Sequence, residues 1–240
     1  CALLGLDSLD EAVALLPRLR ELDSLEAAEV MFDRGVHLVA MHAGLPLPFE
    51  PLPPVLLLVE CAGPRDPLEE LAAALEGLPR VAVAVERAER ERLWAYRERH
   101  TEAINAFGVP LKFDVAVRLP ELASTVHELE GDLEEAWPDA IVVLFGHLAD
   151  GNMHINVLPP ESGTPMLGSR AATAEDVEAL VLRRVIDVGG AISAEHGIGV
   201  AKRDWLVQSR HPSELAPMRA IKRALDPGNL LNPGVLFPPD

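Results

Sequence analysis

Residues 146–156 read Gly-His-Leu-Ala-Asp-Gly-Asn-Met-His-Ile-Asn, and apolar, β-branched runs precede and follow them. An Asp-Gly pair between two such runs predicts a β-hairpin, because both central residues of a type I′ turn need positive φ. With Asp150 and Gly151 as the turn residues, His147 lies directly opposite His154. Side chains in such a pair have Cβ atoms about 5 Å apart, so the two imidazoles can share one metal ion.

A second polar cluster, residues 193–199 (Ser-Ala-Glu-His-Gly-Ile-Gly), supplies the carboxylate of Glu195 and the imidazole of His196. Two histidines and one glutamate are a common ligand set of catalytic metal sites, which leave positions open for a substrate. His147, His154 and Glu195 are therefore candidate ligands of a divalent metal, with zinc or manganese expected. The other interpretation makes each histidine a hydrogen-bonded structural residue of its strand.

Further polar residues are candidates for binding an anionic substrate. Arg97 lies in a long charged segment and Lys112 in an otherwise apolar one. Arginine binds a carboxylate with two parallel hydrogen bonds, whereas lysine acts as a point charge. Taken alone, Arg97 is more simply a charge on the surface of a helix. Asn156, two residues after His154, shares its face of the strand.

Composition restricts the class of protein. The chain has 240 residues and a net charge of −17, which argues against nucleic acid as a partner. Two cysteines do not make a disulfide framework, and reduced thiols suit the cytoplasm. The absence of a signal peptide and of a membrane-length apolar run favours the same location, with peripheral membrane association as the alternative. Without an initiator Met, the chain is expected to be an excerpt from a longer protein.

The hydrophobic pattern predicts an α+β fold with a mainly antiparallel sheet, helices packed on it and a helical C-terminal segment. A parallel doubly wound sheet or an all-helical structure would contradict this prediction. The expected strands are 2–6, 55–61, 81–85, 109–117, the two arms of the hairpin and 191–194. The expected helices are 8–21, a stretch from 24 leading into 36–39, 66–76, 86–107, 120–136, 173–188, 202–209 and 213–225. Loops are expected at 45–54 and 159–169.

Four segments carry a resemblance to a known family: 93–98 (Leu-Trp-Ala-Tyr-Arg-Glu), 111–117 (Leu-Lys-Phe-Asp-Val-Ala-Val), 146–156 and 194–199. Together they resemble the C-terminal half of the FAD-linked oxidases of the vanillyl-alcohol-oxidase type. The most similar branch contains D-lactate dehydrogenase, the glycolate oxidase flavin subunit and D-2-hydroxyglutarate dehydrogenase. The ending 226–234 is similar to the C-terminus of that family.

The resemblance implies a division of the chain and an activity. Residues 1–190 would form a substrate-binding cap domain, and residues 191–240 a segment that packs on an N-terminal FAD domain. The whole enzyme would be an FAD-dependent oxidoreductase that acts on CH–OH groups, oxidises a small 2-hydroxyacid to a 2-oxoacid and passes electrons to an acceptor. A homodimer is compatible with this reading. The chain alone would be inactive and would not retain FAD.

The resemblance also implies residue roles. His147, His154 and Glu195 correspond to the metal ligands. Substrate binding falls to Arg97, Thr101, Lys112 and Asn156, the general base is His196, and Asn232 is a candidate flavin contact. From the residues alone two other classes remain open: a flavin-free metal-dependent hydrolase that uses metal-bound water, and a non-catalytic binding module.

Overall fold

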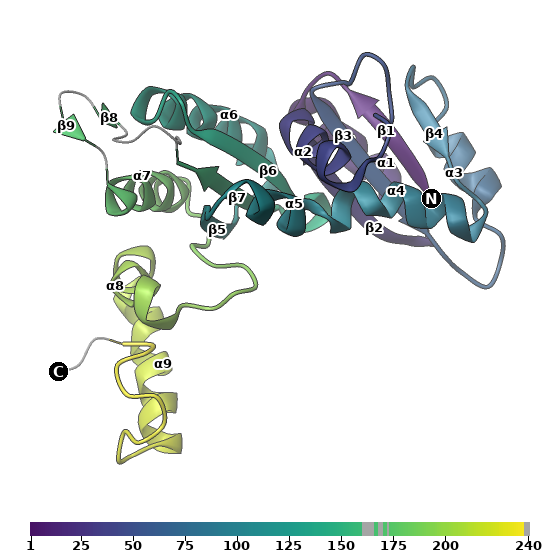
Figure 1. Ribbon diagram of the computed structural model, residues 1–240. Coiled ribbons are helices and arrows are strands. Elements are labelled where there is room, and N and C mark those ends of the chain that lie inside the picture. Colours follow the sequence, from purple (N-terminus) through teal and green to yellow (C-terminus); the bar gives the residue numbers. More distant parts are fainter. Residues whose placement is uncertain (160–165, 168–169, 172, 238–240) are drawn as a thin grey trace.

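The computed structural model describes residues 1–159, 166–167, 170–171 and 173–237 (Figure 1). Its strands are β1 (Ala2–Leu6), β2 (Leu25–Phe32), β3 (Val55–Cys61), β4 (Val81–Val83), β5 (Leu111–Ala116), β6 (Ile141–His147), β7 (Asn152–Leu158), β8 (Met166–Leu167) and β9 (Arg170–Ala171). Its α-helices are α1 (Leu9–Leu19), α2 (Asp33–Ala43), α3 (Leu68–Ala74), α4 (Arg87–Glu98), α5 (His100–Phe107), α6 (Leu119–Ala136), α7 (Ala174–Asp187), α8 (Gly199–Ser209) and α9 (Pro212–Leu225). A short 3₁₀ turn, η1 (Leu148–Asp150), joins β6 to β7.

A seven-stranded sheet organises the molecule, with the order β4-β1-β3-β2-β6-β7-β5. All pairings between its described strands are antiparallel. The predicted α+β class with a mainly antiparallel sheet and packed helices is therefore confirmed.

Helices cover both faces of this sheet. One core packs α1, α6 and α7 against one face, and a second core packs α2, α4 and α5 against the other. Leu57 and Leu58 of β3 are each fully buried although they point to opposite faces. This explains why β1 and β3 read as continuous apolar runs rather than as alternating patterns. Each such side chain contributes roughly 1.5–3 kcal/mol by its burial.

The prediction of a helical stretch from residue 24 is wrong, because residues 25–32 form β2, the central strand. Its Leu, Ala, Glu and Met residues favour helices by intrinsic propensity. Tertiary pairing overrides that preference, since β2 pairs with β3 on one side and β6 on the other, and Val30 and Met31 are fully buried. Strand preference depends on such packing more than on the residues themselves.

Two other predicted elements differ from the structure. The single helix 86–107 is divided into α4 and α5 at Arg99, whose φ of −86° and ψ of 3° leave the helical region. Arg97 and Thr101 therefore do not share the face of one continuous helix. The predicted strand 191–194 is reduced to an isolated bridge between Ala191 and Ala116. Most of the predicted loop 159–169 lies outside the described residues.

The C-terminal helices α8 and α9 project away from the sheet (Figure 1). Their attachment includes a hydrogen bond of 2.8 Å from Trp205 Nε1 to Glu178 Oε1 on α7. Lys202 Nζ donates a second bond of 2.9 Å to the carbonyl of Ile192. The predicted helical C-terminal segment is present. Among the described residues, no helix is long and apolar enough to cross a membrane.

Candidate active site

The β6–β7 hairpin presents its two histidines on one face, but not through the predicted turn. The 3₁₀ turn η1 is followed by Gly151 at φ 65°, so His147 pairs with Asn152 and His154 pairs with Phe145. The predicted direct opposition of the histidines is wrong by two residues. A shift of two keeps every side chain on its face, whereas a shift of one would reverse it. The histidines are thus diagonal neighbours, with ring centroids 5.5 Å apart.

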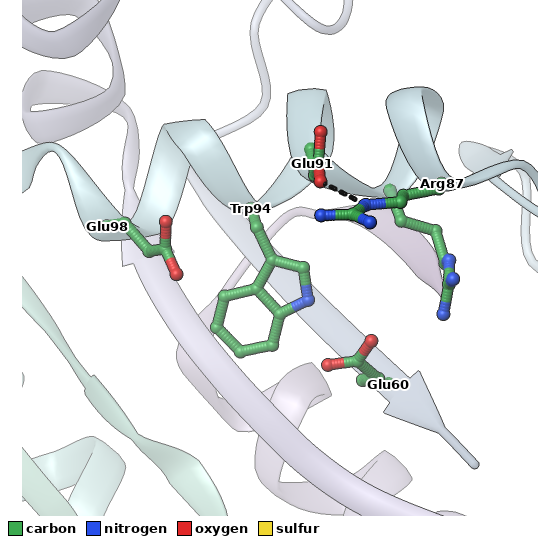
Figure 2. A pocket seen from close by; sticks show the side chains of 6 residues that line it. Glu60, Arg87, Glu91, Trp94 and Glu98 are labelled. Atoms are coloured by element: carbon green, nitrogen blue, oxygen red, sulfur yellow. Dashed lines mark hydrogen bonds and ion pairs between the residues drawn. The ribbon is translucent and has the colours of Figure 1, made fainter.

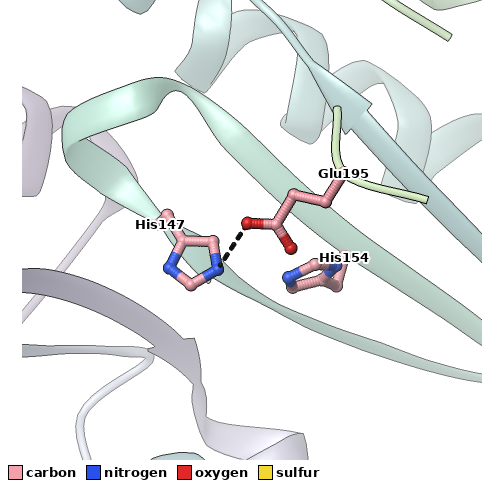
Figure 3. A group of neighbouring side chains, drawn as sticks. All are labelled: His147, His154 and Glu195. Carbon is pink, nitrogen blue, oxygen red and sulfur yellow. Dashed lines mark ion pairs between the residues drawn. The ribbon is translucent and has the colours of Figure 1, made fainter. Parts of the chain in front are cut away.

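Glu195 approaches these histidines from the loop between α7 and α8 (Figure 3). Its Oε1 lies 3.4 Å from His147 Nε2. One ligand atom from each of His147, His154 and Glu195 lies within 4.8 Å of the others. The structure therefore brings the three predicted metal ligands together, and their two nitrogens and one oxygen suit a borderline divalent ion such as zinc.

Asp114 of β5 fixes the loop that carries Glu195. Its carboxylate is fully buried, and Oδ2 accepts backbone hydrogen bonds from Ala194, Glu195 and His196 at 3.1, 2.7 and 2.9 Å. Burial by itself raises the pKa of the Asp114 carboxyl, but the N–H groups of Glu195 and His196 together with electrostatic attraction to His196 and His154 outweigh it, and the pKa is lowered. The other oxygen, Oδ1, lies 3.7 Å from His154 Nδ1. This anchoring role was not assigned to Asp114 by the sequence analysis.

Glu29 of β2 lies behind His147. Its Oε1 is 2.7 Å from His147 Nδ1, and its Oε2 accepts a bond of 2.7 Å from Arg97 Nε. Sequence reasoning missed Glu29 because the stretch from residue 24 leading into 36–39 is predicted to be helical, which hides the alternation of a strand. Both histidines thus have a carboxylate near Nδ1, an arrangement that orients imidazole ligands in metal sites.

The electrostatics of His154 suit a ligand. Burial lowers the pKa of its imidazole below the usual value, and the nearby Arg97 guanidinium lowers it further. A histidine must be neutral to bind a metal ion, so a lowered pKa extends the pH range in which His154 is competent.

Two of the predicted substrate-binding residues, Arg97 and Asn156, lie beside this cluster, and Lys112 lies on the neighbouring strand β5. The Arg97 guanidinium carbon lies 4.7 Å from the centre of the Phe145 ring, next to His154. Asn156 is buried on the same face as His154 and pairs in register with Lys112 of β5. Lys112 itself is exposed, and its Nζ donates a hydrogen bond of 3.1 Å to Asn105 Oδ1 of α5.

Thr101 is exposed on α5, one helical turn before Asn105. Asn105 was not among the predicted site residues, although its spacing of four from Thr101 could have indicated it. The proposed base His196 has a side chain 60% exposed, and its ring is stacked 6.0 Å from that of His154. It is therefore accessible to a molecule bound at the His cluster.

Asn232 lies elsewhere, in the segment after α9. It lines a hollow of about 490 Å³ together with residues such as Arg219, Lys222 and Phe237. Another hollow, of about 590 Å³, is formed by Glu60, Arg87, Arg90, Glu91, Trp94 and Glu98 (Figure 2). There Arg87 pairs with Glu91, so the charges of its wall partly neutralise each other. The cluster of His147, His154 and Glu195 is the candidate active site because its ligand atoms converge, not because of the volume of a hollow.

Residues 1–236 match the sequence profile of the family described as FAD linked oxidases, C-terminal domain. The chain belongs to this family. Membership confirms the resemblance found in the sequence motifs. D-2-hydroxyglutarate dehydrogenase of Xanthomonas citri pv. viticola is 37% identical over 242 residues, which cover 98% of this chain and 50% of that protein. The mitochondrial D-2-hydroxyglutarate dehydrogenase of Bos taurus is 36% identical over 224 residues, covering 89% of this chain and 39% of that protein.

This FAD-linked oxidase C-terminal domain thus spans about half the length of the bacterial relative. Its fold is similar to two solved structures. p-Cresol methylhydroxylase with substrate bound has a TM-score of 0.63 at 13% identity, covering 99% of this chain and 52% of that chain. 4-Ethylphenol oxidase from Gulosibacter chungangensis, in its isoeugenol complex, has a TM-score of 0.59 at 16% identity, covering 99% of this chain and 53% of that chain. These two likenesses concern the fold alone.

Proposed function

We propose that this chain is the substrate- and metal-binding part of a flavin-dependent D-2-hydroxyacid dehydrogenase, with D-2-hydroxyglutarate as the substrate. The observation that carries the proposal is the convergence of His147, His154 and Glu195 beside Arg97. A set of metal ligands next to the positively charged side chain of Arg97 suits a substrate that has both a hydroxyl group and a carboxylate. The names of the bacterial and bovine relatives support the choice of substrate.

The donor set fits a divalent metal, and zinc suits its mixed nitrogen and oxygen atoms better than magnesium or calcium. Held by His147, His154 and Glu195, the ion would act as a Lewis acid toward an oxygen of the substrate. The flavin, bound mainly by a separate FAD domain on which residues 191–240 would pack, would accept the hydride.

The side chains of this chain would bind and orient the substrate. Arg97 and Lys112 supply positive charge for its carboxylates, and Thr101 and Asn156 supply hydrogen bonds. Two positively charged side chains suit a dicarboxylate better than lactate or glycolate, which carry one carboxylate each. His196, exposed next to His154, would take the hydroxyl proton at a ring nitrogen. The reaction would also need an external electron acceptor, and we propose a cytoplasmic location.

Metal analysis of the chain prepared without chelators tests the metal site. We expect about one zinc or manganese ion per chain, and its loss in His147→Ala. His37→Ala is the matched control, because His37 is exposed on α2 and, within the described part of the chain, its ring bonds only to the carbonyl of Asp33. Equal metal content in His147→Ala and the unchanged chain would contradict the assignment.

Kinetics of the FAD-containing enzyme test the reaction. With an artificial electron acceptor, we expect kcat/KM to be highest for D-2-hydroxyglutarate, compared with D-lactate and glycolate. Arg97→Ala should chiefly raise KM, because binding of a carboxylate is shared by ground and transition states. His196→Ala should lower kcat by roughly 10²- to 10⁴-fold, as expected for a general base. Hydrolytic turnover by this chain without flavin would instead favour a metal-dependent hydrolase.

A further inference from the structure

Glu29 holds two functional side chains with one carboxylate. It lies in the central strand β2, directly opposite His147 in the register with β6, and its side chain is 8% exposed. Each carboxylate oxygen has a different partner. Oε1 lies 2.7 Å from His147 Nδ1, and Oε2 lies 2.7 Å from Arg97 Nε.

The contact with His147 determines which ring nitrogen can bind a metal. A carboxylate only accepts hydrogen bonds, so the imidazole must carry its proton on Nδ1. The unprotonated nitrogen is then Nε2, which lies 3.4 Å from Glu195 Oε1, on the side of the proposed ion. A Glu29 carboxylate in this place thus selects the tautomer that the metal site needs.

The contact with Arg97 determines how its guanidinium is presented. The Nε–H of Arg97 donates to Glu29, and the central guanidinium carbon lies over the Phe145 ring, 4.7 Å from its centre. The two Nη groups have no hydrogen-bond partner among the described residues, which leaves this edge of the guanidinium for a planar anion. Arg97 and Glu29 side chains are only 12% and 8% exposed, so solvent screens the pair weakly.

We propose that Glu29 is a positioning residue that fixes His147 for the metal and Arg97 for the substrate carboxylate at the same time. This inference rests on the proposed function. It predicts that one substitution at Glu29, a residue that contacts neither the ion nor the substrate, weakens the binding of both. Glutamine is the informative replacement, because it keeps the size of the side chain but has only one acceptor oxygen for two donors.

Zinc binding by the chain itself gives the first readout. In calorimetric titrations with Zn²⁺ alone, Glu29→Gln should bind the ion about 10- to 100-fold more weakly than the unchanged chain. Glu60→Gln is the matched control. Glu60 lies in the neighbouring strand β3, pairs with Ala27 and so points to the same face, but it lines the hollow of Figure 2. Its substitution should leave zinc affinity unchanged.

The second readout separates positioning from simple structural support. In the FAD-containing enzyme with saturating Zn²⁺, Glu29→Gln should recover most of kcat, since the ion is restored, but KM should stay raised because Arg97 remains misplaced. A merely structural role would not produce this division. Recovery of both constants to wild-type values would overturn the role in carboxylate binding.

A third measurement needs no variant that must fold. The ¹⁵N chemical shifts of the His147 ring in the unchanged, metal-free chain should report a proton on Nδ1 at alkaline pH. A proton on Nε2 would overturn the inference. Equal zinc affinity of folded Glu29→Gln and the unchanged chain would also overturn it, but would leave the proposed function intact. Failure of the unchanged chain to bind Zn²⁺ would overturn both.

Discussion

At the scale of the residue, the spacing within residues 146–156 and 193–199 was enough to select three candidate metal ligands that the fold brings together. His147 and His154 share a face in any hairpin register that shifts by two residues, so the error in the turn did not separate them. Glu29 and Asp114 could not be assigned in the same way. Their roles come from strands that are distant in sequence, and no local pattern states which histidine a carboxylate will meet.

His100 is a buried histidine whose pKa is strongly lowered. It is 1% exposed, its ring centroid lies 4.6 Å from that of Phe145, and its two ring nitrogens have no hydrogen-bond partner among the described residues. Burial lowers the pKa of the His100 imidazole from 6.5 to about 3, and the charge of Arg97 contributes. The residue is therefore neutral in the folded protein at pH values above about 3.

This shift predicts a pH dependence of stability. Between pH 6.5 and about 3 the unfolded chain protonates His100 and the folded chain does not. The contribution of His100 is thus fully present above pH 6.5 and decreases as the pH falls through this window, by up to about 1.4 kcal/mol per pH unit. In His100→Leu, the free energy of unfolding in urea should fall less steeply from pH 6 to pH 4. The same steepness in variant and wild type would show that His100 is not the group responsible.

At the scale of the element, the hairpin depends on Gly151. Its φ is 65°, and a Cβ at this position would lie 2.1 Å from the carbonyl oxygen of Val117. The sequence motif indicated a positive φ here, but not the contact with Val117, which lies directly after β5. Two separate constraints therefore require glycine in the turn that positions His147 and His154.

We expect Gly151→Ala to destabilise the fold far more than Gly44→Ala. Gly44 ends α2 with nearly the same φ of 64°, but a Cβ there would meet no atom within 4 Å. Gly44→Ala should cost about 1 kcal/mol, the price of the left-handed backbone alone. Gly151→Ala adds the clash with Val117 and should also weaken zinc binding. Urea unfolding and zinc titration of both variants check this, and similar losses in the two would show that the hairpin can shift to admit a Cβ.

The elements that sequence analysis misjudged were those whose form depends on contacts elsewhere in the chain. β1 and β3 were predicted because a buried apolar run is a local signal. β2 was not, because its helix-favouring residues become a strand only between β3 and β6. The break at Arg99 is equally invisible in a continuous charged segment; before it Arg97 contacts Glu29, and after it His100 is buried against α2.

At the scale of the whole molecule, the sheet collects the candidate active site from five segments that are far apart in sequence. Glu29, Arg97, the β5 residues, the hairpin and the loop of Glu195 meet only in the folded chain. The family resemblance predicted most of these residues because it already contains that folded arrangement. The pairing of Glu29 with both His147 and Arg97 depends on β2 and β6 lying side by side, which no local pattern indicates.

The projecting C-terminal part of the chain, α9 and the residues that follow it, carries several large apolar side chains that are exposed to solvent. Ile221 is 61% exposed, Leu225 77%, Leu230 83% and Leu231 64%. A group of exposed large apolar residues favours an interaction surface. Because the chain covers about half of its bacterial relative, we expect these residues to contact the FAD-binding half of the enzyme.

Replacing Ile221 and Leu225 by aspartate should therefore lower the FAD content and kcat of the FAD-containing enzyme. The thermal stability of this chain alone should hardly change, since substitutions at exposed positions are usually within about 0.5 kcal/mol of neutral. Met41→Asp is the control, because Met41 of α2 is 69% exposed but lies outside the C-terminal helices. Flavin absorbance per protein and melting temperature are the measurements. A doubly substituted enzyme that keeps its full FAD content would show that this surface serves another contact, whereas loss of FAD in Met41→Asp as well would show that the effect is not specific to α9.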